Sequence, residues 1–260
     1  MNPLVMMGTL IMAIGGVERQ VDLEQRYDLS LPLVAGAEGP SAWYVGPPRM
    51  EPVRANGWVG AVAEGGSVNF RDVFFNPHGH GTHTECVGHI TEVVHSVNEV
   101  VLPTFMPALV ISLEPEVRGE DRVFPAAALR ERVESLAQKG EPVALIVRTL
   151  PNDPAKRLKN WSNTNPTYFE AEGLAFLADY GVDHLLVDLP SVDREEDGGA
   201  LAGHRAFWQV EGSVRMHATI TEFTFVPDEV SDGWYALNLQ TAAFVNDATP
   251  SRPLLHPLKP

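Results

Sequence analysis

The sequence predicts one α/β domain, with a mixed sheet and flanking helices, across residues 1–260. Two observations in the second half support this prediction. Continuous apolar runs at 143–148 and 184–188 are typical of strands whose two faces are both covered. Helical spacing of apolar residues over 125–138 and 168–180 places a helix between successive strands. Such alternation predicts a partly parallel sheet with helices packed on it.

The remaining predicted strands are short and bounded by glycine, proline and asparagine. In chain order they are a hairpin of 9–14 and 17–23 that turns at Gly15-Gly16, a strand at 28–33, a second hairpin of 58–62 and 68–75, and strands at 109–113, 219–225 and 236–239. The segment 76–89 contains three glycines and a proline, which predicts a loop at the end of a strand. Loops held by a rigid scaffold often carry functional residues.

The composition limits the possible partners and compartments. Acidic residues outnumber basic ones 34 to 19, and the formal charge of −15 disfavours both nucleic acid and anionic membranes. The single cysteine, Cys86, excludes an intrachain disulfide and a four-cysteine zinc site, which suits a cytoplasmic location. The apolar stretch 4–14 lacks a basic leader and continues into Gly15-Gly16, so we expect the hairpin there and no signal peptide.

Four of the nine histidines lie within twelve residues: His78, His80, His83 and His89. Glu85 lies among them. Imidazole and carboxylate ligands suit zinc, manganese or iron(II), whereas calcium and magnesium prefer oxygen ligands alone. A solvent-exposed histidine-rich loop without a ligand is the alternative interpretation. The density of ligands between flexible glycines favours metal binding.

Other chemistries find less support in the sequence. His83 and His89 are six residues apart, so the segment is not the His-Glu-x-x-His helix of metalloproteases. No Gly-x-Ser-x-Gly motif predicts a serine nucleophile. Cys86 lies beside the histidines and has the chemistry of a thiol nucleophile, but a small residue that fills space beneath the metal is the favoured interpretation.

The segment resembles the signature His-x-Gly-Thr-His-x-Asp-x-Pro-x-His of the cyclase family, which includes metal-dependent kynurenine formamidases and isatin hydrolase. Gly81-Thr82-His83 matches the central triplet, and His89 matches the final histidine. Further similarities follow in the family order: Asp28-Leu29-Ser30, Leu145-Ile146-Val147-Arg148-Thr149, Asp188-Leu189-Pro190-Ser191-Val192-Asp193, and the tail 246–253. The resemblance extends over most of the chain and implies a swivelling β/β/α-type domain.

Three positions depart from the family pattern. Glu85 replaces the aspartate, Val87 replaces the proline, and Gly79 stands where the first histidine belongs. His78 and His80 flank that glycine, and either is a candidate ligand. We favour His78, because the residues after it can bulge outward while His78 stays anchored at the strand end; His80 would then face the substrate.

The resemblance also implies a set of metal ligands, with one or two Zn²⁺ or Mn²⁺ ions per chain. The expected ligands are His78 (or His80), His83 and Glu85 for one ion, and His89, His204 and Glu222 for a second ion or for the surroundings of the reactive water. His204 and Glu222 are 18 residues apart, wider than in the family, which an insertion around 210–217 would explain. His89 and Glu85 are the expected catalytic residues.

The implied activity is metal-dependent hydrolysis of a small amide, lactam or ester. N-formylkynurenine is one candidate substrate, and a homodimer or homotetramer is expected by resemblance alone. Two other functions remain open: a non-catalytic metal- or ligand-binding member of the same fold, and a metal-dependent lyase or dehydratase. Hydrolysis and elimination both need a Lewis acid and a base, so the sequence does not separate them.

Overall fold

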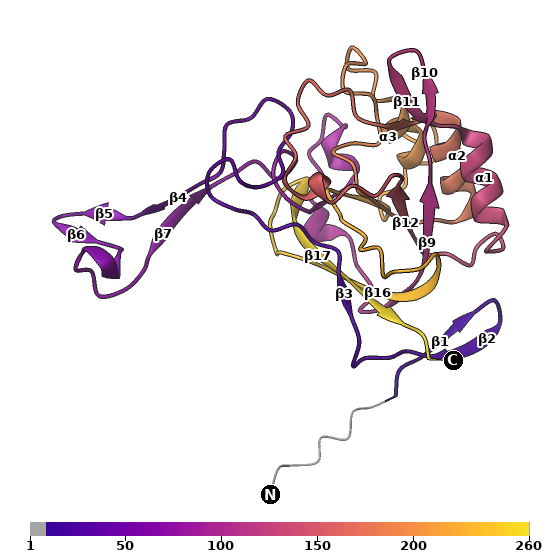
Figure 1. Cartoon of the computed structure of the whole chain (residues 1–260), viewed down its shortest axis with the longest axis horizontal. Helices are drawn as coiled ribbons and strands as arrows, with labels where there is room; N and C mark the ends of the chain where they lie inside the picture. Colours follow the sequence, from indigo (N-terminus) through magenta and orange to yellow (C-terminus); the bar gives the residue numbers. More distant parts are fainter. Residues whose placement is uncertain (1–8, 260) are drawn as a thin grey trace, which may run out of the picture.

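Seven strands close into a mixed, barrel-like sheet in the computed structural model, which describes residues 9–259 (Figure 1). Around the ring these strands are β16 (Gly233–Thr241), β9 (Met106–Leu113), β12 (Ala144–Thr149), β14 (His184–Val187), β15 (Thr219–Glu222), β8 (His83–Glu85) and β17 (Ala248–Pro257). A further pairing between β16 and β17 closes the ring, and β3 (Tyr27–Asp28) adds to β17. Neighbours from β9 to β15 are parallel and the other pairs antiparallel, so the mixed sheet is confirmed.

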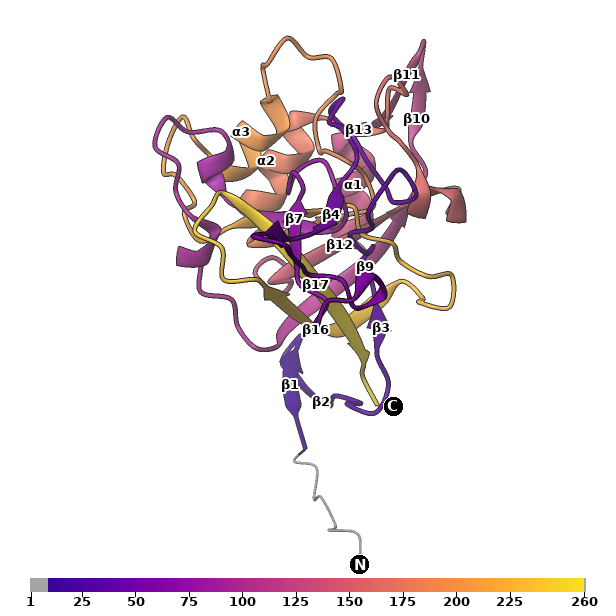
Figure 2. The same ribbon diagram turned by 90° about the vertical axis from the view of Figure 1, so that its left-hand side faces the viewer.

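Three helices pack together beside the parallel strands (Figure 2). They are α1 (Ala126–Glu134), α2 (Ala171–Tyr180) and α3 (Ala202–Trp208). The first two lie where the sequence predicts them but are shorter. Residues 168–169 form β13 (Tyr168–Phe169), which pairs with β11 (Asp121–Phe124), because tertiary strand pairing overrides local helical spacing there. β10 (Glu116–Arg118) completes that small sheet.

Strand β12 shows why its sequence is continuously apolar. Leu145 and Val147 belong to the hydrophobic cluster shared with the helices, whereas Ala144 and Ile146 belong to the cluster inside the barrel. All four are at most 1 % exposed. Successive side chains of a strand point to opposite faces, so a strand covered on both sides needs apolar residues at every position.

The first half departs most from the sequence-based expectation. The N-terminal hairpin is confirmed as β1 (Ile11–Ile14) and β2 (Val17–Gln20), and residues 4–8 of the apolar stretch lie outside the described residues. The predicted pairing of 58–62 with 68–75 is wrong. β6 (Trp58–Val59) pairs with β5 (Arg54–Ala55), and β7 (Arg71–Phe74) pairs with β4 (Arg49–Pro52).

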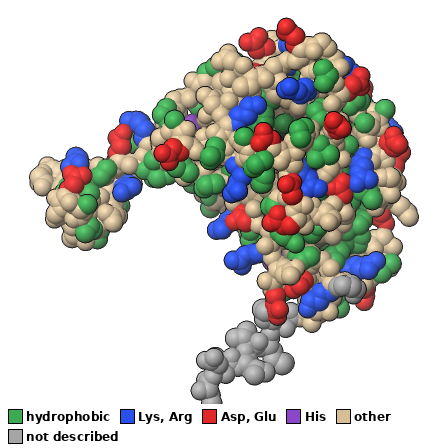
Figure 3. Space-filling model, viewed as in Figure 1, with side chains coloured by type: hydrophobic (Ala, Val, Ile, Leu, Met, Phe, Trp, Pro, Cys, Tyr) green, Lys and Arg blue, Asp and Glu red, His purple; other side chains and the backbone are tan. Residues whose placement is uncertain are grey.

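These four strands form an arm, residues 49–74, that projects from the body of the molecule (Figures 1 and 3). Its first turn is Asn56-Gly57, with φ of 51° and 79°. Positive φ at both positions favours Asn-Gly in a tight hairpin, and the strand prediction overlooked this turn signal.

Within residues 9–259, no helix is long and apolar enough to cross a membrane.

Candidate metal centre

The predicted loop 76–89 contains a buried strand, β8, at the centre of the candidate site. β8 lies between β15 and β17, and its three residues are fully buried. His83 and Glu85 are two positions apart, so their side chains share one face of the sheet. Thr84 points to the other face, where its hydroxyl lies 2.8 Å from that of Thr221.

Sheet register brings Glu222 into the site. In the antiparallel β8–β15 pair Glu222 lies directly opposite His83, and its Oε2 is 3.3 Å from His83 Nε2. Directly opposed residues project on the same face, so Glu222 joins His83 and Glu85. The other ring nitrogen of His83, Nδ1, lies 3.2 Å from the carbonyl oxygen of Gly81. The two arginines nearest to Glu222 in the sequence pair with other carboxylates, Arg205 with Glu211 and Arg215 with Asp183.

Two glycines shape the chain on either side of β8. Gly81 has a φ of 67°, which favours glycine because it has no Cβ. A Cβ on Gly88 would lie 2.0 Å from the carbonyl oxygen of His95, so only glycine allows this close approach. The short 3-10 turn Val87–His89 then places His89 over β8, where its ring stacks on His78 with 4.1 Å between centroids.

Helix α3 supplies His204 from the opposite side. Asp193 accepts the backbone N–H groups of Gly203 and His204 at 2.5 and 3.2 Å, which anchors the start of this short helix. The same carboxylate lies 2.5 Å from His204 Nδ1, and His204 Nε2 points at Glu85 Oε1 from 3.0 Å. His204 is 2 % exposed, so it is not a surface histidine of the helix.

Asp247 is a site residue that the sequence reasoning missed, although the tail segment around it was recognised. Its Oδ2 lies 2.8 Å from His78 Nε2 and 3.3 Å from His89 Nδ1. The opposite nitrogens of these two rings face Glu85, with His78 Nδ1 at 3.0 Å and His89 Nε2 at 3.9 Å from Oε2. Asp247 is more than 150 positions from both histidines in the sequence, so no local motif could indicate that it contacts them.

The four imidazoles therefore share one arrangement. Each ring holds one nitrogen against an outer oxygen acceptor and directs the other toward Glu85 or Glu222. Histidines that bind metal usually donate their second N–H to such an outer acceptor. Three groupings lie close enough to share an ion, with ligand atoms within 4.8 Å of one another: His78, His83 and Glu85; Glu85, His89 and His204; and His78, His89 and Asp247.

The residues also fit a cation energetically. Glu85 and Glu222 are 0 % and 3 % exposed, and their ion-pair partners within residues 9–259 are histidines alone. His83 Nε2, Glu85 Oε2 and Glu222 Oε1 are buried without an aligned hydrogen bond. An unpaired buried carboxylate costs several kcal/mol. A divalent ion between these atoms would satisfy all three.

In the ion-free chain, raised pKa values of His78 and His204 allow these imidazoles to compensate the carboxylates. Burial lowers the pKa of His78, but hydrogen bonds to Asp247 and Glu85 outweigh it and raise the pKa to about 10. Burial raises the pKa of Glu85, yet the charge of His89 and the hydrogen bonds from His204 and His78 bring it well below its usual value. Burial and the nearby charge of Glu85 raise the pKa of Glu222.

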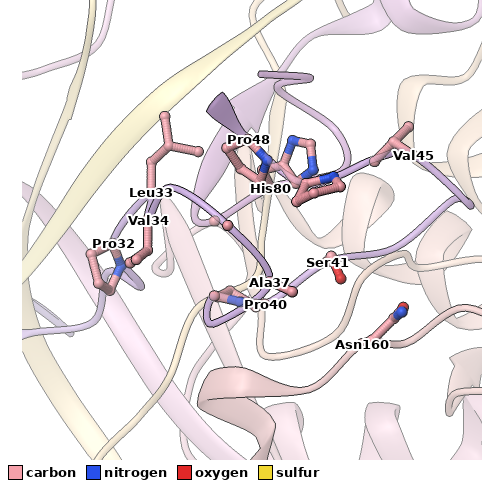
Figure 4. A pocket seen from close by; sticks show the side chains of 14 residues that line it. Pro32, Leu33, Val34, Ala37, Pro40, Ser41, Val45, Pro48, His80 and Asn160 are labelled. Atoms are coloured by element: carbon pink, nitrogen blue, oxygen red, sulfur yellow. The ribbon is translucent and has the colours of Figure 1, made fainter. Parts of the chain in front are cut away.

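His80 lies elsewhere. Its Nδ1 accepts the backbone N–H of Asn76 at 3.0 Å, and its Nε2 lies 3.0 Å from the carbonyl oxygen of Gly46. Figure 4 shows it next to Pro48, in a separate pocket of the proline-rich loop that Val45 also lines. Of the two alternative histidines, the structure thus brings His78 to the cluster, and His80 does not face the cleft above it.

A cleft of about 320 Å³ opens onto the cluster. Trp43, Asn76 and Leu201 line it together with His78, His89, His204 and Glu222. Arg194 is the only lysine or arginine in the lining, and its guanidinium pairs with Asp121 at 3.0 Å. Cys86 is buried beneath the site; burial raises the pKa of its thiol to about 11, which disfavours a nucleophilic role.

The fold matches solved structures along nearly its full length. A potential metal-dependent hydrolase with cyclase activity shares 16% identity at a TM-score of 0.65, covering 91% of this chain and 99% of that one. A predicted metal-dependent hydrolase from Bacillus stearothermophilus shares 16% identity at a TM-score of 0.62, covering 89% of this chain and 98% of that one. An isatin hydrolase with the product analogue thioisatinate shares 14% identity at 0.64, covering 90% and 93%. No match was found among curated proteins.

The Cyclase family model matches residues 27–194, which is more than half of the chain. The chain therefore belongs to the Cyclase family, as a divergent member with the fold of the solved metal-dependent hydrolases. The matched segment includes β8 and Asp193 but ends before His204, Glu222 and Asp247.

Proposed function

We propose that this chain is a metal-dependent hydrolase that uses water to attack the carbonyl of a small amide, lactam or ester. The observation that carries the proposal is the convergence of four imidazoles with Glu85 and Glu222 around three buried atoms that lack an aligned hydrogen bond. Family membership and the hydrolases of the same fold support it.

The proposed ligands follow from which atoms converge. His78, His83 and Glu85 would hold one ion, and Glu85 would share its carboxylate with a second ion held by His204, Glu222 and His89. Mixed imidazole and carboxylate ligands favour Zn²⁺ or Mn²⁺. When bound, such an ion acidifies water and polarises a carbonyl oxygen.

The proposed roles of the protein groups follow from exposure. His89 is the most exposed of the four clustered histidines, with 29% of its side chain accessible, and it lines the cleft. In a site with a single ion, where His89 is not a ligand, its Nε2 would be free to take a proton from water and return it to the leaving group. Glu85, whose Oε2 lies 3.9 Å from His89 Nε2, is the alternative proton acceptor, because a carboxylate keeps further lone pairs when it binds an ion. The apolar ring of Trp43 would hold the substrate and exclude water.

The cleft lining also favours one kind of substrate. Because Arg194 is engaged by Asp121, the lining offers no free lysine or arginine to a substrate carboxylate. Asp193, Glu195 and Asp197 add negative charge around it. An uncharged aromatic amide, lactam or ester therefore fits better than a substrate that carries a carboxylate, as N-formylkynurenine does.

The proposal includes a cytoplasmic homodimer or homotetramer. The exposed aromatic and aliphatic side chains of the projecting arm support self-association, since contiguous exposed apolar surface is typical of interfaces. They include Trp58, Val62, Val68, Phe70 and Phe74. The single cysteine suits a reducing compartment.

Metal analysis and a substrate panel test the activity. Protein purified without chelator or histidine tag should contain one or two equivalents of zinc or manganese by elemental mass spectrometry. It should hydrolyse members of a panel of formanilides, lactams including isatin, and aryl esters, with ¹⁸O from labelled water entering the acid product. Glu92→Gln, an exposed charge change three positions after His89 in the chain, is the matched control.

Two outcomes would reject the proposal. A chain that binds no zinc or manganese even after reconstitution is a non-catalytic member. A product with a new double bond and no ¹⁸O identifies a lyase.

A further inference from the structure

Asp247 differs from the other carboxylates of the site in its contacts. Within residues 9–259 its ion-pair partners are two imidazoles, His78 and His89, and both contact the same oxygen, Oδ2. Those two rings are stacked with 27° between their planes. One acceptor therefore contacts the outer nitrogen of both rings at once.

The sheet fixes this acceptor in place. Asp247 immediately precedes β17, whose first residue, Ala248, lies opposite Glu85 in the β8–β17 pair. The backbone N–H of Cys86 donates to the carbonyl oxygen of Asp247 at 3.0 Å. The preceding carbonyl, of Asn246, accepts the N–H of Val97 at 2.9 Å. The backbone on both sides of the carboxylate is thus tied to the segment that carries His89.

We propose that Asp247 is a positioning residue: it determines which ring nitrogen of His78 and of His89 faces the metal. This inference rests on the proposed function. By accepting both outer N–H groups, it turns His78 Nδ1 and His89 Nε2 toward Glu85. His204 is held in the same way by a different carboxylate, Asp193, so the two halves of the cluster have separate outer acceptors. Outer acceptors of this kind typically contribute 10–100-fold to metal affinity.

Asp247→Asn tests the proposal, because the amide keeps the size of the side chain but lacks the charge and has one acceptor oxygen. Affinity for Zn²⁺ is measured by competition with a chromogenic chelator, and Co²⁺ absorption reports the ligand geometry. We expect a 10–100-fold weaker affinity, an unchanged number of ions per chain and a shifted Co²⁺ spectrum. Glu92→Gln removes the same charge from an exposed position and should leave all three unchanged.

Nitrogen-15 NMR of the histidine rings in the metal-free protein gives a second readout. Asp247→Asn should shift the signals of His78 Nε2 and His89 Nδ1 and leave those of His204 in place. Affinity within twofold of the unsubstituted chain together with unmoved ring signals would overturn the proposal, and so would loss of one ion per chain, which would make Asp247 a ligand. If the unsubstituted chain binds no metal, the proposed function fails, whereas the ring signals still decide the role of Asp247.

Discussion

The Nε2 atom of His204 lies 3.0 Å from Oε1 of Glu85, across 119 positions of sequence. On its other oxygen, Oε2, the same carboxylate contacts His78 and His89. Two groups of side chains could each hold an ion: His78, His83 and Glu85, and Glu85, His89 and His204. Glu85 is the residue that both groups share.

Glu85→Gln should weaken binding of every ion at the site, since the amide removes the shared charge. We expect at least about a 100-fold loss of Zn²⁺ affinity, or about 2.7 kcal/mol, and a loss of kcat/KM of similar size. Glu85→Asp, which restores the family residue, keeps the charge but retracts it by about 1.5 Å. Its Zn²⁺ affinity should therefore lie between those of the unsubstituted chain and Glu85→Gln. Chelator competition and steady-state kinetics measure both. Unchanged affinity in Glu85→Gln would remove Glu85 from the ligand set.

The two flanking histidines should behave oppositely on substitution. His78→Ala removes an imidazole that faces Glu85, so metal affinity should fall about 10–1,000-fold. His80→Ala removes hydrogen bonds in the separate loop pocket, so it should lower the free energy of unfolding by about 1 kcal/mol and leave metal content unchanged. Elemental analysis and urea unfolding separate the two effects. Metal loss in His80→Ala would return His80 to the ligand set.

Neutralising Glu222 should stabilise the metal-free protein. Burial and Glu85 disfavour its charged form, so Glu222→Gln relieves repulsion between two buried carboxylates. We expect the melting temperature to rise by about 2–4 °C without metal, for a gain of about 1 kcal/mol. Saturating Zn²⁺ should reverse the order, because the unsubstituted chain gains more from binding. A lower melting temperature without metal would show that the contact with His83 outweighs the repulsion.

His184 lies outside the site and gives a pH prediction. Burial lowers its pKa from 6.5 to about 4, and Nδ1 lies 2.9 Å from Thr219 Oγ1. Below pH 6.5, His184 is protonated in the unfolded chain but stays neutral in the folded chain. The free energy of unfolding therefore falls as the pH falls from 6.5 to about 4. His184→Asn should lack this loss. Its unfolding free energy, measured in urea without metal, should drop by about 2 kcal/mol less than that of the unsubstituted chain between pH 7.5 and 5. Parallel pH profiles would contradict the shift.

The projecting arm should carry the contact between copies. Trp58 and Phe70 are 39% and 59% exposed, and their ring centroids are 6.0 Å apart. If the proposed homodimer or homotetramer forms through the arm, replacing both with serine should give a monomer in sedimentation velocity, with little change in melting temperature. Val117→Ser is the control, because Val117 is 70% exposed on a different hairpin. An oligomer that survives the double substitution would place the interface elsewhere.

Local patterns were informative where burial imposes a period on the chain. The apolar runs of β12 and β14 and the helical spacing of α2 are direct consequences of packing on both faces of a sheet, so the sequence located them within a few residues. The arm was mispaired, because its strands are mostly exposed and no buried face fixes their register.

By itself the sequence determined the fold class and predicted a site rich in imidazole and carboxylate groups, since hydrophobic period and side-chain type are properties of short segments. His83, Glu85 and His89 lie together because they are neighbours in the chain. Only the tertiary structure decided between His78 and His80, and only strand register brought Asp247 against two of the histidines. Pairing of distant strands sets which side chains share a face, and single-chain spacing does not encode that pairing.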